Sequence, residues 1–240
     1  MDPAQAPRLR VLDLFSATGS ITKAFHEHEV TSLDLDPRFG PTICKDVFDW
    51  DYSALPSGTY DVIWASVPCE QYSLARSNAL TPRDLVLADR IVQRTRDIIE
   101  HFKPRCWFVE NPSSSMLWRR FEWHRLVKTS YCSYDFRYRK HTSIATNVDL
   151  TLRARCGGAG VCGSMQGTHH AEHAQKGGKK GGGPNNICHT RDELHRVPEG
   201  LCADVVKCCQ GEAFKYAWVR TKIQERVVSH PPMIPRCSNA

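Results

Sequence analysis

Tyr60-Asp61-Val62-Ile63-Trp64-Ala65-Ser66-Val67-Pro68-Cys69 is the segment around which the rest of the chain is organised. The predicted strand over residues 61–66 is apolar at residues 62–65 and is bounded by the polar Asp61 and Ser66, which is typical of a short strand in a parallel sheet covered on both faces. Pro68 stiffens the backbone where the strand stops. Cys69 therefore lies at the carboxyl end of a strand, where open α/β sheets place their chemistry, and this position suits a nucleophile.

The composition is that of an intracellular protein. The 240 residues suffice for one sizeable α/β domain with an elaboration, and 41% of them are hydrophobic. The net charge of +6 gives weak support to a polyanionic partner. Eleven cysteines, an odd number, occur without a signal peptide. We therefore expect thiols in a reducing compartment, nucleus or cytoplasm, and no membrane association, because no apolar run reaches spanning length.

The N-terminal part predicts a binding site for a nucleoside cofactor. Residues 10–15 form a buried strand, residues 16–20 a turn of small residues, and residues 21–28 a helix. Gly19 allows close backbone approach, although one glycine in a loop is a weak signal. The glycines lack the spacing that cradles a pyrophosphate, so a dinucleotide is not implied.

Acidic residues end the first strands. The first strand contains Asp13, a second strand over residues 30–34 closes on Asp34, and a short third strand over residues 44–47 is predicted to end on Asp46. A carboxylate at the end of the second strand can accept both hydroxyls of a ribose. A solvated loop acid is the alternative for Asp34 alone, but three such endings in order favour a cofactor site.

The middle of the chain predicts a second candidate catalytic group. Thr81 is predicted to cap a helix that stops at Lys103, and a buried strand over residues 106–109 follows. This strand ends on Glu110, which lies beside Cys69 if the two strands are neighbours, although a helix-capping carboxylate is the alternative. Residues 113–128 are predicted to be helical, with aromatic side chains in the core, and residues 142–147 to form a last strand.

The composition changes after residue 155. Residues 156–186 are rich in glycine, histidine and lysine and cannot build a core. Thiols and imidazoles gathered in this way suit zinc, with candidate ligands Cys156, Cys162, His169, His173 and Cys188. A flexible basic loop that touches phosphates is the alternative, because the spacing matches no zinc-finger pattern. A helix over residues 198–206 then returns to the core.

These patterns together predict an α/β protein with a mostly parallel, Rossmann-like sheet and helices on both faces. We expect a catalytic core over residues 8–150, a small insertion rich in glycine, cysteine and histidine over residues 151–196, and a helix and strand over residues 197–230 that return to the core.

The motifs resemble, in order and in placement at strand ends, those of the C5-cytosine-specific DNA methyltransferases. The residues that carry the resemblance are Asp13-Leu14-Phe15-Ser16-Ala17-Thr18-Gly19, Asp34, Asp46-Val47, Pro68-Cys69 with Ser73, and Glu110-Asn111. The resemblance covers residues 9–150 and implies the fold of S-adenosylmethionine-dependent methyltransferases. It implies that S-adenosylmethionine is bound by Asp13, Leu14, Phe15, Ser16, Gly19, Asp34, Asp46, Val47 and Pro68.

The resemblance also implies the reaction, methylation of cytosine C5 in DNA. Cys69 would add to C6 of a cytosine that has left the duplex, Glu110 would act at N3, and Asn111 would orient it or hold the base. Arg139 matches the first arginine of a basic family segment that contacts base and backbone.

Some positions depart from the family pattern. Glu70 stands where a glutamine is usual, Pro112 replaces a valine, and His141 replaces a second arginine. The Gly-Asn motif that completes the cofactor pocket is not visible, and the helix over residues 198–207 is our hypothesis for its substitute; a circularly permuted or truncated enzyme is the alternative. Two rival functions remain: methylation of cytosine in RNA, and a catalytically silent relative that binds nucleic acid or regulates a partner. We expect the chain to act as a monomer or with a protein partner.

Overall fold

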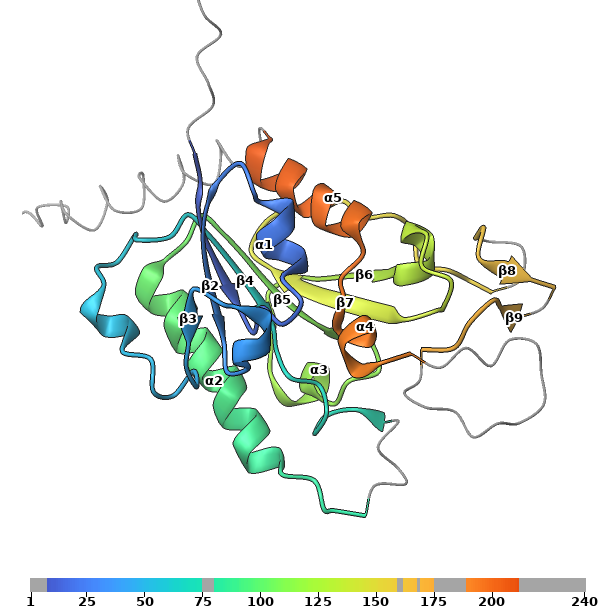
Figure 1. Cartoon of the computed structure of the whole chain (residues 1–240), viewed down its shortest axis with the longest axis horizontal. Coiled ribbons are helices and arrows are strands. Elements are labelled where there is room, and N and C mark those ends of the chain that lie inside the picture. Colours follow the sequence, from blue (N-terminus) through green and yellow to red (C-terminus); the bar gives the residue numbers. More distant parts are fainter. Residues whose placement is uncertain (1–7, 75–79, 159–161, 168, 175–188, 212–240) are drawn as a thin grey trace, which may run out of the picture.

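A seven-stranded sheet forms the centre of the computed structural model, which describes residues 8–74, 80–158, 162–167, 169–174 and 189–211 (Figure 1). Its strand order is β3-β2-β1-β4-β5-β7-β6, and every pairing is parallel except those of β7, which runs antiparallel to both neighbours. The strands are β1 (Arg10–Leu14), β2 (Glu29–Asp34), β3 (Ile43–Cys44), β4 (Val62–Ser66), β5 (Cys106–Pro112), β6 (Leu126–Ser130) and β7 (His141–Thr146).

The central strands are apolar throughout because both faces of the sheet are covered. In β4, Val62 and Trp64 pack into one hydrophobic cluster, whereas Ile63 and Ala65 pack into the other. Side chains alternate between the two faces of a strand, so a strand between two layers reads as an unbroken apolar run. The stretch that ends at Cys69 has this pattern.

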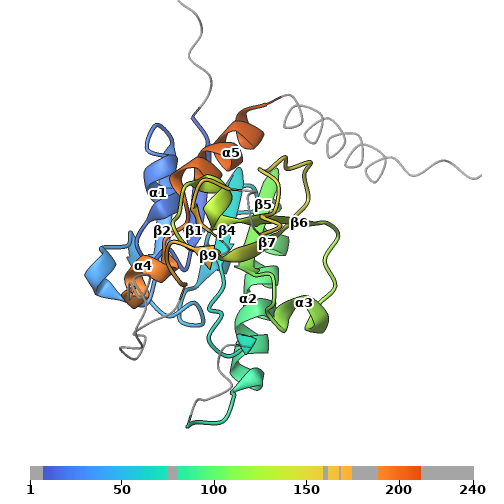
Figure 2. The ribbon, with the colours of Figure 1, turned by 90° about the vertical axis from the view of Figure 1, so that its right-hand side faces the viewer.

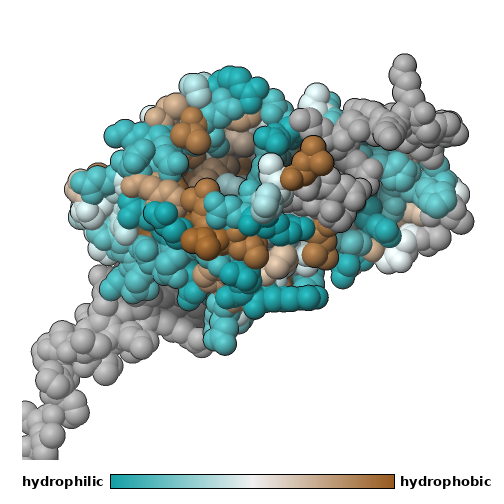
Figure 3. Space-filling view, turned by 90° about the horizontal axis from the view of Figure 1, so that it is seen from below, coloured by the Kyte–Doolittle hydropathy of each residue, from teal (hydrophilic) through white to brown (hydrophobic). Residues whose placement is uncertain are grey.

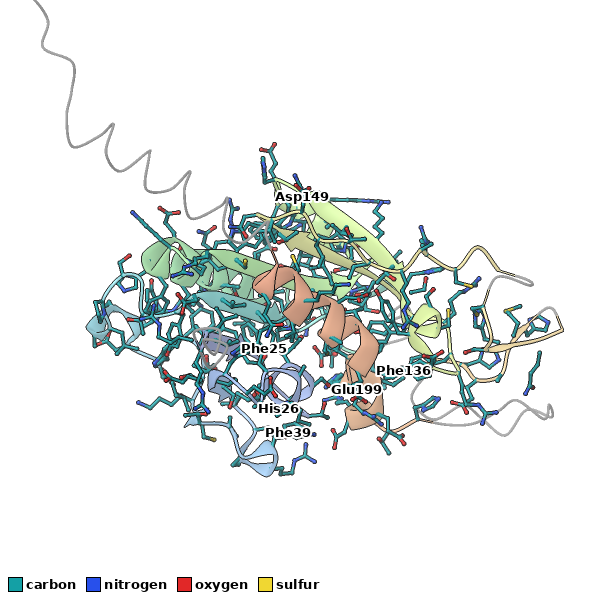
Figure 4. All side chains as sticks on the ribbon, turned by 90° about the horizontal axis from the view of Figure 1, so that it is seen from above. Phe25, His26, Phe39, Phe136, Asp149 and Glu199 are labelled. Carbon is teal, nitrogen blue, oxygen red and sulfur yellow. The ribbon has the colours of Figure 1, made fainter. Side chains whose placement is uncertain are left out.

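Helices form the two outer layers. α1 (Ser20–Ala24) and α5 (Glu199–Gln210) lie together on one face, and α2 (Leu85–Phe102) covers the other, with the short α3 (Leu117–Arg120) beside it (Figure 2). Figure 4, in which Phe25 and Glu199 are labelled, shows α5 lying along the α1 side of the sheet. Leu201 and Val205 of α5 are fully buried in the same cluster as Phe25.

Short elements complete the described part of the chain. They are the 3-10 helices η1 (Pro37–Phe39), η2 (Tyr52–Ala54) and η4 (Tyr131–Tyr134), the helix α4 (Arg191–His195), and a hairpin of β8 (Met165–Gln166) and β9 (His169–His170). The hairpin projects from the side of the main sheet (Figure 1).

Two predicted helix ends differ from the structure. Asp84, not Thr81, caps α2, since its side chain accepts a hydrogen bond of 2.8 Å from the backbone N–H of Leu87. The first helix ends at Ala24 rather than residue 28, because the chain turns at Phe25 into β2. The end of α2 agrees with the prediction, with Lys103 in the left-handed conformation.

The predicted helix over residues 113–128 is wrong. Only Leu117–Arg120 is helical, and the chain becomes extended at Phe121 before it enters β6. β6 pairs with β7 from Leu126 to Ser130, so pairing with a distant strand overrides the helical spacing of the apolar residues. Trp118 and Phe121 nevertheless pack against the core, as expected.

The predicted fold class is confirmed by the strand order and the two helical layers. The predicted return of the chain to the core after residue 197 corresponds to α5, whereas the strand expected before residue 230 lies outside the described residues. The division into a core, an insertion and a returning segment stays a prediction. None of the helices that the structure describes has the length and apolarity needed to span a membrane.

Truncating a buried side chain of α2 tests the layer that covers the sheet. Val92 is fully buried, whereas Val86, on the same helix, is 74% exposed. We expect Val92→Ala to lower the free energy of unfolding by about 2 kcal/mol, because two methyl groups are lost and a cavity remains. Val86→Ala is the control and should change it by less than about 0.5 kcal/mol in urea denaturation. Equal effects would contradict this packing.

Candidate active site

A cavity of about 360 Å³ opens at the carboxyl ends of β1, β2, β4 and β5. Figure 3 views the molecule from this side, where the surface is hollowed between apolar and hydrophilic residues. The lining includes two of the four predicted catalytic residues, Cys69 and Glu110. It also includes the predicted cofactor residues Asp13, Phe15, Ser16, Asp34 and Pro68. The structure thus brings the two predicted sets of residues into one space.

The loop after β1 forms one wall in an unusual backbone conformation. Phe15 and Ala17 have positive φ angles of 58° and 40°, and Gly19 has a φ of 69°. The backbone N–H of Ser16 donates to the carbonyl of Leu33 at 3.2 Å, which ties the loop to β2. Non-glycine residues adopt positive φ at an energetic cost, so such a loop persists only where its surroundings hold it.

Asp34 holds this loop and faces the cavity. Its Oδ2 accepts a hydrogen bond from the backbone N–H of Ala17 at 2.8 Å, and its Oδ1 accepts one from Asp36 at 2.8 Å. Each carboxylate oxygen can accept a further donor. The side chain is therefore oriented by the backbone and can still accept two hydroxyl groups.

Four predicted cofactor residues are not among those that line the cavity. Leu14 is fully buried in the core, and Gly19 acts as the left-handed N-cap of α1. β3 ends at Cys44, before the predicted residue, and Asp46 instead accepts a hydrogen bond from the backbone N–H of Phe48 at 2.9 Å. Val47 is buried in the hydrophobic cluster on the face of the sheet that α2 covers.

Asp13 is a buried acid in the lining of the cavity. Only 1% of its surface is exposed, and its Oδ2 accepts hydrogen bonds from the hydroxyl of Thr22 at 2.8 Å and from the backbone N–H of Thr22 at 3.2 Å. Burial raises the pKa of Asp13 to about 7, and its bonds to Thr22 oppose the rise. Asp13 therefore links β1 to α1 and keeps its proton to a higher pH than an exposed aspartic acid.

Cys69 lies in an environment that favours the neutral thiol. Burial raises the pKa of Cys69 to about 11, the charge of Lys140 lowers it, and Glu70 and Glu110 raise it further. Lys140 lines the same cavity, and its Nζ donates to the carbonyl of Leu194 at 3.1 Å. Lys140 thus favours the thiolate, against the effect of burial.

Glu110 lies next to the end of β4, and two hydroxyl groups bind its carboxyl group. It pairs in register with Ser66, the last residue of β4, and only 6% of it is exposed. The hydroxyl of Tyr131 donates to Glu110 Oε1 at 3.3 Å, and the hydroxyl of Thr142 donates to the same oxygen. The sequence analysis missed Tyr131 and Thr142, because only the packing of β7 and η4 against β5 brings them to Glu110.

Asn111 stabilises the Cys69 loop. It is fully buried, and its Nδ2 donates to the carbonyl of Val67 at 2.7 Å. Its Oδ1 finds no hydrogen-bond partner among the described residues. The side chain therefore ties the end of β5 to the backbone just before Pro68-Cys69 and is not among the residues that line the cavity.

The basic segment before β7 contributes Lys140 to the cavity in place of the predicted Arg139. Arg139 instead lines a second, smaller cavity of about 170 Å³, together with His170. Neighbouring residues of an extended chain point to opposite sides, so a shift of one residue exchanges the two side chains. The identity of the segment could be predicted from its charge, but not which residue faces inward.

The segment before α5 closes the cavity from the α1 side. Arg191, His195 and Val197 line it, and the backbone N–H of Val197 donates to Ser20 Oγ at 3.1 Å. His195 Nε2 lies 3.9 Å from Glu70 Oε1, and burial lowers the pKa of His195. The sequence predicts that the chain returns to the core with a helix that begins at residue 198. The residues of this segment that line the cavity lie just before that helix.

The predicted metal ligands are brought together in part. Cys156 and Cys162 lie in one group with Cys132 and His170, which the sequence analysis had not chosen. His169 and His173 are exposed and lie outside this group. Cys188 lies outside the described residues.

The raised pKa of Asp13 predicts a pH dependence of stability. An acid whose pKa is higher in the folded chain stabilises the fold fully below its unfolded pKa of 3.8, and this stabilisation is lost as the pH rises through about 7. In Asp13→Asn this loss is absent. The free energy of unfolding of Asp13→Asn relative to the native chain should therefore increase from pH 4 to pH 8, by up to about 4 kcal/mol. Urea denaturation across this range measures it.

Asp49→Asn, in an exposed loop, is the matched control. Its difference from the native chain should stay flat over the same range. A flat difference for Asp13→Asn as well would mean that Asp13 is not the buried acid described above.

No protein-family profile matches the chain. A protein of Frog virus 3 (isolate Goorha) named probable DNA (cytosine-5)-methyltransferase is 29% identical over 220 residues, 84% of this chain and 100% of the viral protein.

Solved methyltransferase structures superpose on part of the chain. The Entamoeba histolytica methyltransferase EhMeth has a TM-score of 0.44 and 14% identity over 62% of this chain and 57% of its own. A prophage-encoded DNA modification methyltransferase from E. coli has a TM-score of 0.45 and 14% identity over 60% of this chain and 49% of its own. The viral relative confirms what the motifs predict: the chain resembles the C5-cytosine-specific DNA methyltransferases.

Proposed function

We propose that the chain is a DNA (cytosine-5)-methyltransferase that transfers a methyl group from S-adenosylmethionine. The observation that carries the proposal is a single cavity lined by Cys69, Glu110 and the carboxylate of Asp34. A thiol and a carboxyl group suit the activation of a pyrimidine, and a carboxylate at the end of β2 suits a nucleoside. The viral relative, whose name gives the same reaction, supports this assignment.

The residues of the β1 and β2 ends fit the cofactor. Asp34 has two acceptor positions free for ribose hydroxyls, and Phe15, Ile21 and Val197 supply apolar surface. A cavity of about 360 Å³ falls in the range of small-molecule sites. When bound, S-adenosylmethionine supplies an electrophilic methyl group on a sulfonium.

Cys69 is the proposed nucleophile. Its sulfur adds to C6 of cytosine, and the electron pair of the C5–C6 bond becomes available at C5 for attack on the methyl group. Loss of the C5 proton then expels Cys69. The net effect of its surroundings raises the pKa of this thiol to about 11, chiefly through burial, and the ammonium of Lys140 opposes that rise and so favours the thiolate.

Glu110 is the proposed acid at cytosine N3. Addition of the thiolate increases electron density at N3, which a protonated carboxyl group relieves by donating a proton or hydrogen bond. Tyr131 and Thr142 both bond to Oε1, so they orient the carboxyl group and leave Oε2 for the base. The target cytosine must leave the duplex to reach this cavity.

The segment before α5 is the proposed substitute for the missing Gly-Asn motif. Val197 lines the cavity, and its bond to Ser20 fixes the segment against α1. A reducing compartment inside the cell is part of this proposal and is supported by the free thiols of the nine cysteines in the described chain. RNA is the rival polymer, and the assay below distinguishes it.

Replacement of the proposed nucleophile tests the reaction. Cys69→Ser should abolish methyl transfer from tritium-labelled S-adenosylmethionine to duplex DNA, because a hydroxyl is a far weaker nucleophile than a thiolate, while cofactor binding measured by calorimetry changes little. A 5-fluorocytosine duplex should form a covalent adduct with the native chain and none with the variant.

Cys44→Ser, which changes an exposed cysteine, should keep both transfer and adduct. Transfer RNA and single-stranded DNA are assayed in parallel, and stronger labelling of RNA would replace DNA as the substrate. Unchanged turnover in Cys69→Ser would exclude the covalent mechanism.

The electrostatic role of Lys140 gives a second prediction. Without its positive charge the pKa of Cys69 should rise, so Lys140→Met should move the pH–rate profile to higher pH and lower the rate at neutral pH by about tenfold per pKa unit. Lys128→Met, an exposed lysine on β6, is the control. A profile of unchanged shape in Lys140→Met would remove this role.

A further inference from the structure

Four metal-ligating side chains meet outside the candidate active site. Cys132 lies on η4, Cys156 and Cys162 lie in the insertion, and His170 lies on β9. Their ligand atoms all fall within 4.8 Å of one another, and three of the four residues are buried. The catalytic proposal uses none of them.

The distances match those of a tetrahedral metal site. Cys156 Sγ lies 3.8 Å from Cys162 Sγ, and His170 Nε2 lies 3.6 Å from the first sulfur and 3.4 Å from the second. Zinc binds sulfur at about 2.3 Å and nitrogen at about 2.0 to 2.1 Å, so a tetrahedron has edges of about 3.8 Å between sulfurs and about 3.6 Å from sulfur to nitrogen. A disulfide would need about 2.05 Å between sulfurs, so the pair is not bonded.

We propose that Cys132, Cys156, Cys162 and His170 bind one structural zinc ion. Three thiolates and one imidazole complete a tetrahedral shell with protein ligands alone, which is the composition of structural rather than catalytic zinc. Such a shell leaves no position for water or substrate.

The surrounding charge suits this ligand set. Three thiolates and one divalent ion carry a net charge of −1, which a nearby cation offsets. Arg139 lines the small cavity beside His170. The predicted catalytic arginine therefore faces the proposed metal site.

The site joins the insertion to the catalytic core. The backbone N–H of Cys156 donates to Ser130 Oγ at 3.0 Å, at the end of β6. On the other side, the N–H of Glu172 donates to the carbonyl of Arg137 at 3.0 Å, and Ser164 Oγ donates to the carbonyl of Phe136 at 2.7 Å. The ion would thus cross-link three segments that are also joined by these hydrogen bonds and by the ion pair of Arg137 with Glu172.

The cross-linked segment carries active-site groups at both ends. Tyr131, which bonds to Glu110, directly precedes Cys132. Lys140, which lines the candidate active site, follows two residues after Tyr138, which forms a β-bridge to Glu172. Loss of the ion would release the segment between β6 and β7. The zinc site therefore positions these two groups and takes no part in the chemistry.

The metal content of the purified full chain tests the proposal independently of methyl transfer. Chain produced with zinc in the medium should contain one zinc ion per molecule by plasma mass spectrometry. Replacement with Co²⁺ should give the intense visible absorption and the sulfur-to-metal charge-transfer bands of tetrahedral cobalt with thiolate ligands. Substoichiometric metal after zinc supplementation, or a cobalt spectrum without thiolate bands, would overturn it.

Adjacent histidines provide the matched variants. His170→Ala should lose most of the bound zinc, whereas His169→Ala, one residue away and exposed, should retain one ion per chain. Cys162→Ser should also lose zinc, and Cys44→Ser should retain it. Equal zinc content in His170→Ala and His169→Ala would exclude the proposed shell.

A folding defect is separated from loss of a ligand by the cobalt spectrum of Cys162→Asp. A carboxylate can still bind the ion but removes one thiolate, so the charge-transfer intensity should fall by about one third while cobalt remains bound. An unchanged intensity would remove Cys162 from the shell.

Discussion

The parallel register between β4 and β5 is the constraint on which the candidate site depends. It pairs Ser66 with Glu110, and Cys69 follows three residues after Ser66, so a thiol and a carboxyl group from segments forty residues apart reach one cavity. Asn111 fixes this arrangement, since its bond to the carbonyl of Val67 ties the two strand ends together. A slip of one residue would turn Glu110 to the opposite face of the sheet.

Burial raises the pKa values of two groups at the candidate site. The same apolar environment that stabilises the sheet raises the pKa values of Asp13 and Cys69. Asp13 and Cys69, which both line the cavity, therefore favour their neutral forms. Lys140 opposes this effect at Cys69, which gives one residue of the basic segment an electrostatic role that its neighbour Arg139 does not share.

The segment between β6 and β7 connects the two proposed sites. Tyr131 at its start bonds to Glu110, Lys140 at its end lines the catalytic cavity, and Cys132 belongs to the proposed zinc shell. In this arrangement the small insertion does not need a hydrophobic core of its own, because a metal ion can supply the cross-links that its composition cannot. In this proposal the ion would hold the insertion against the segment between β6 and β7 and so keep that segment in position.

Local patterns in the sequence are enough to locate the central strands of the parallel sheet and the residues at their ends. Apolar runs bounded by polar residues mark β1, β2, β4 and β5, and this local pattern places Asp34, Cys69 and Glu110 at the ends of strands. That Cys69 lies near Glu110 depends on the pairing of β4 with β5, which the local pattern left as a condition. Tertiary contacts make residues 126–130 a strand, because pairing with β7 outweighs the helical spacing of the apolar residues. Tertiary contacts also place Lys140, and not Arg139, in the lining of the candidate active site. In the same way they bring Cys132 and His170, and not His169 and His173, into the group of possible metal ligands. Which side chains converge depends on contacts between segments far apart in the chain, and local sequence patterns do not contain these contacts.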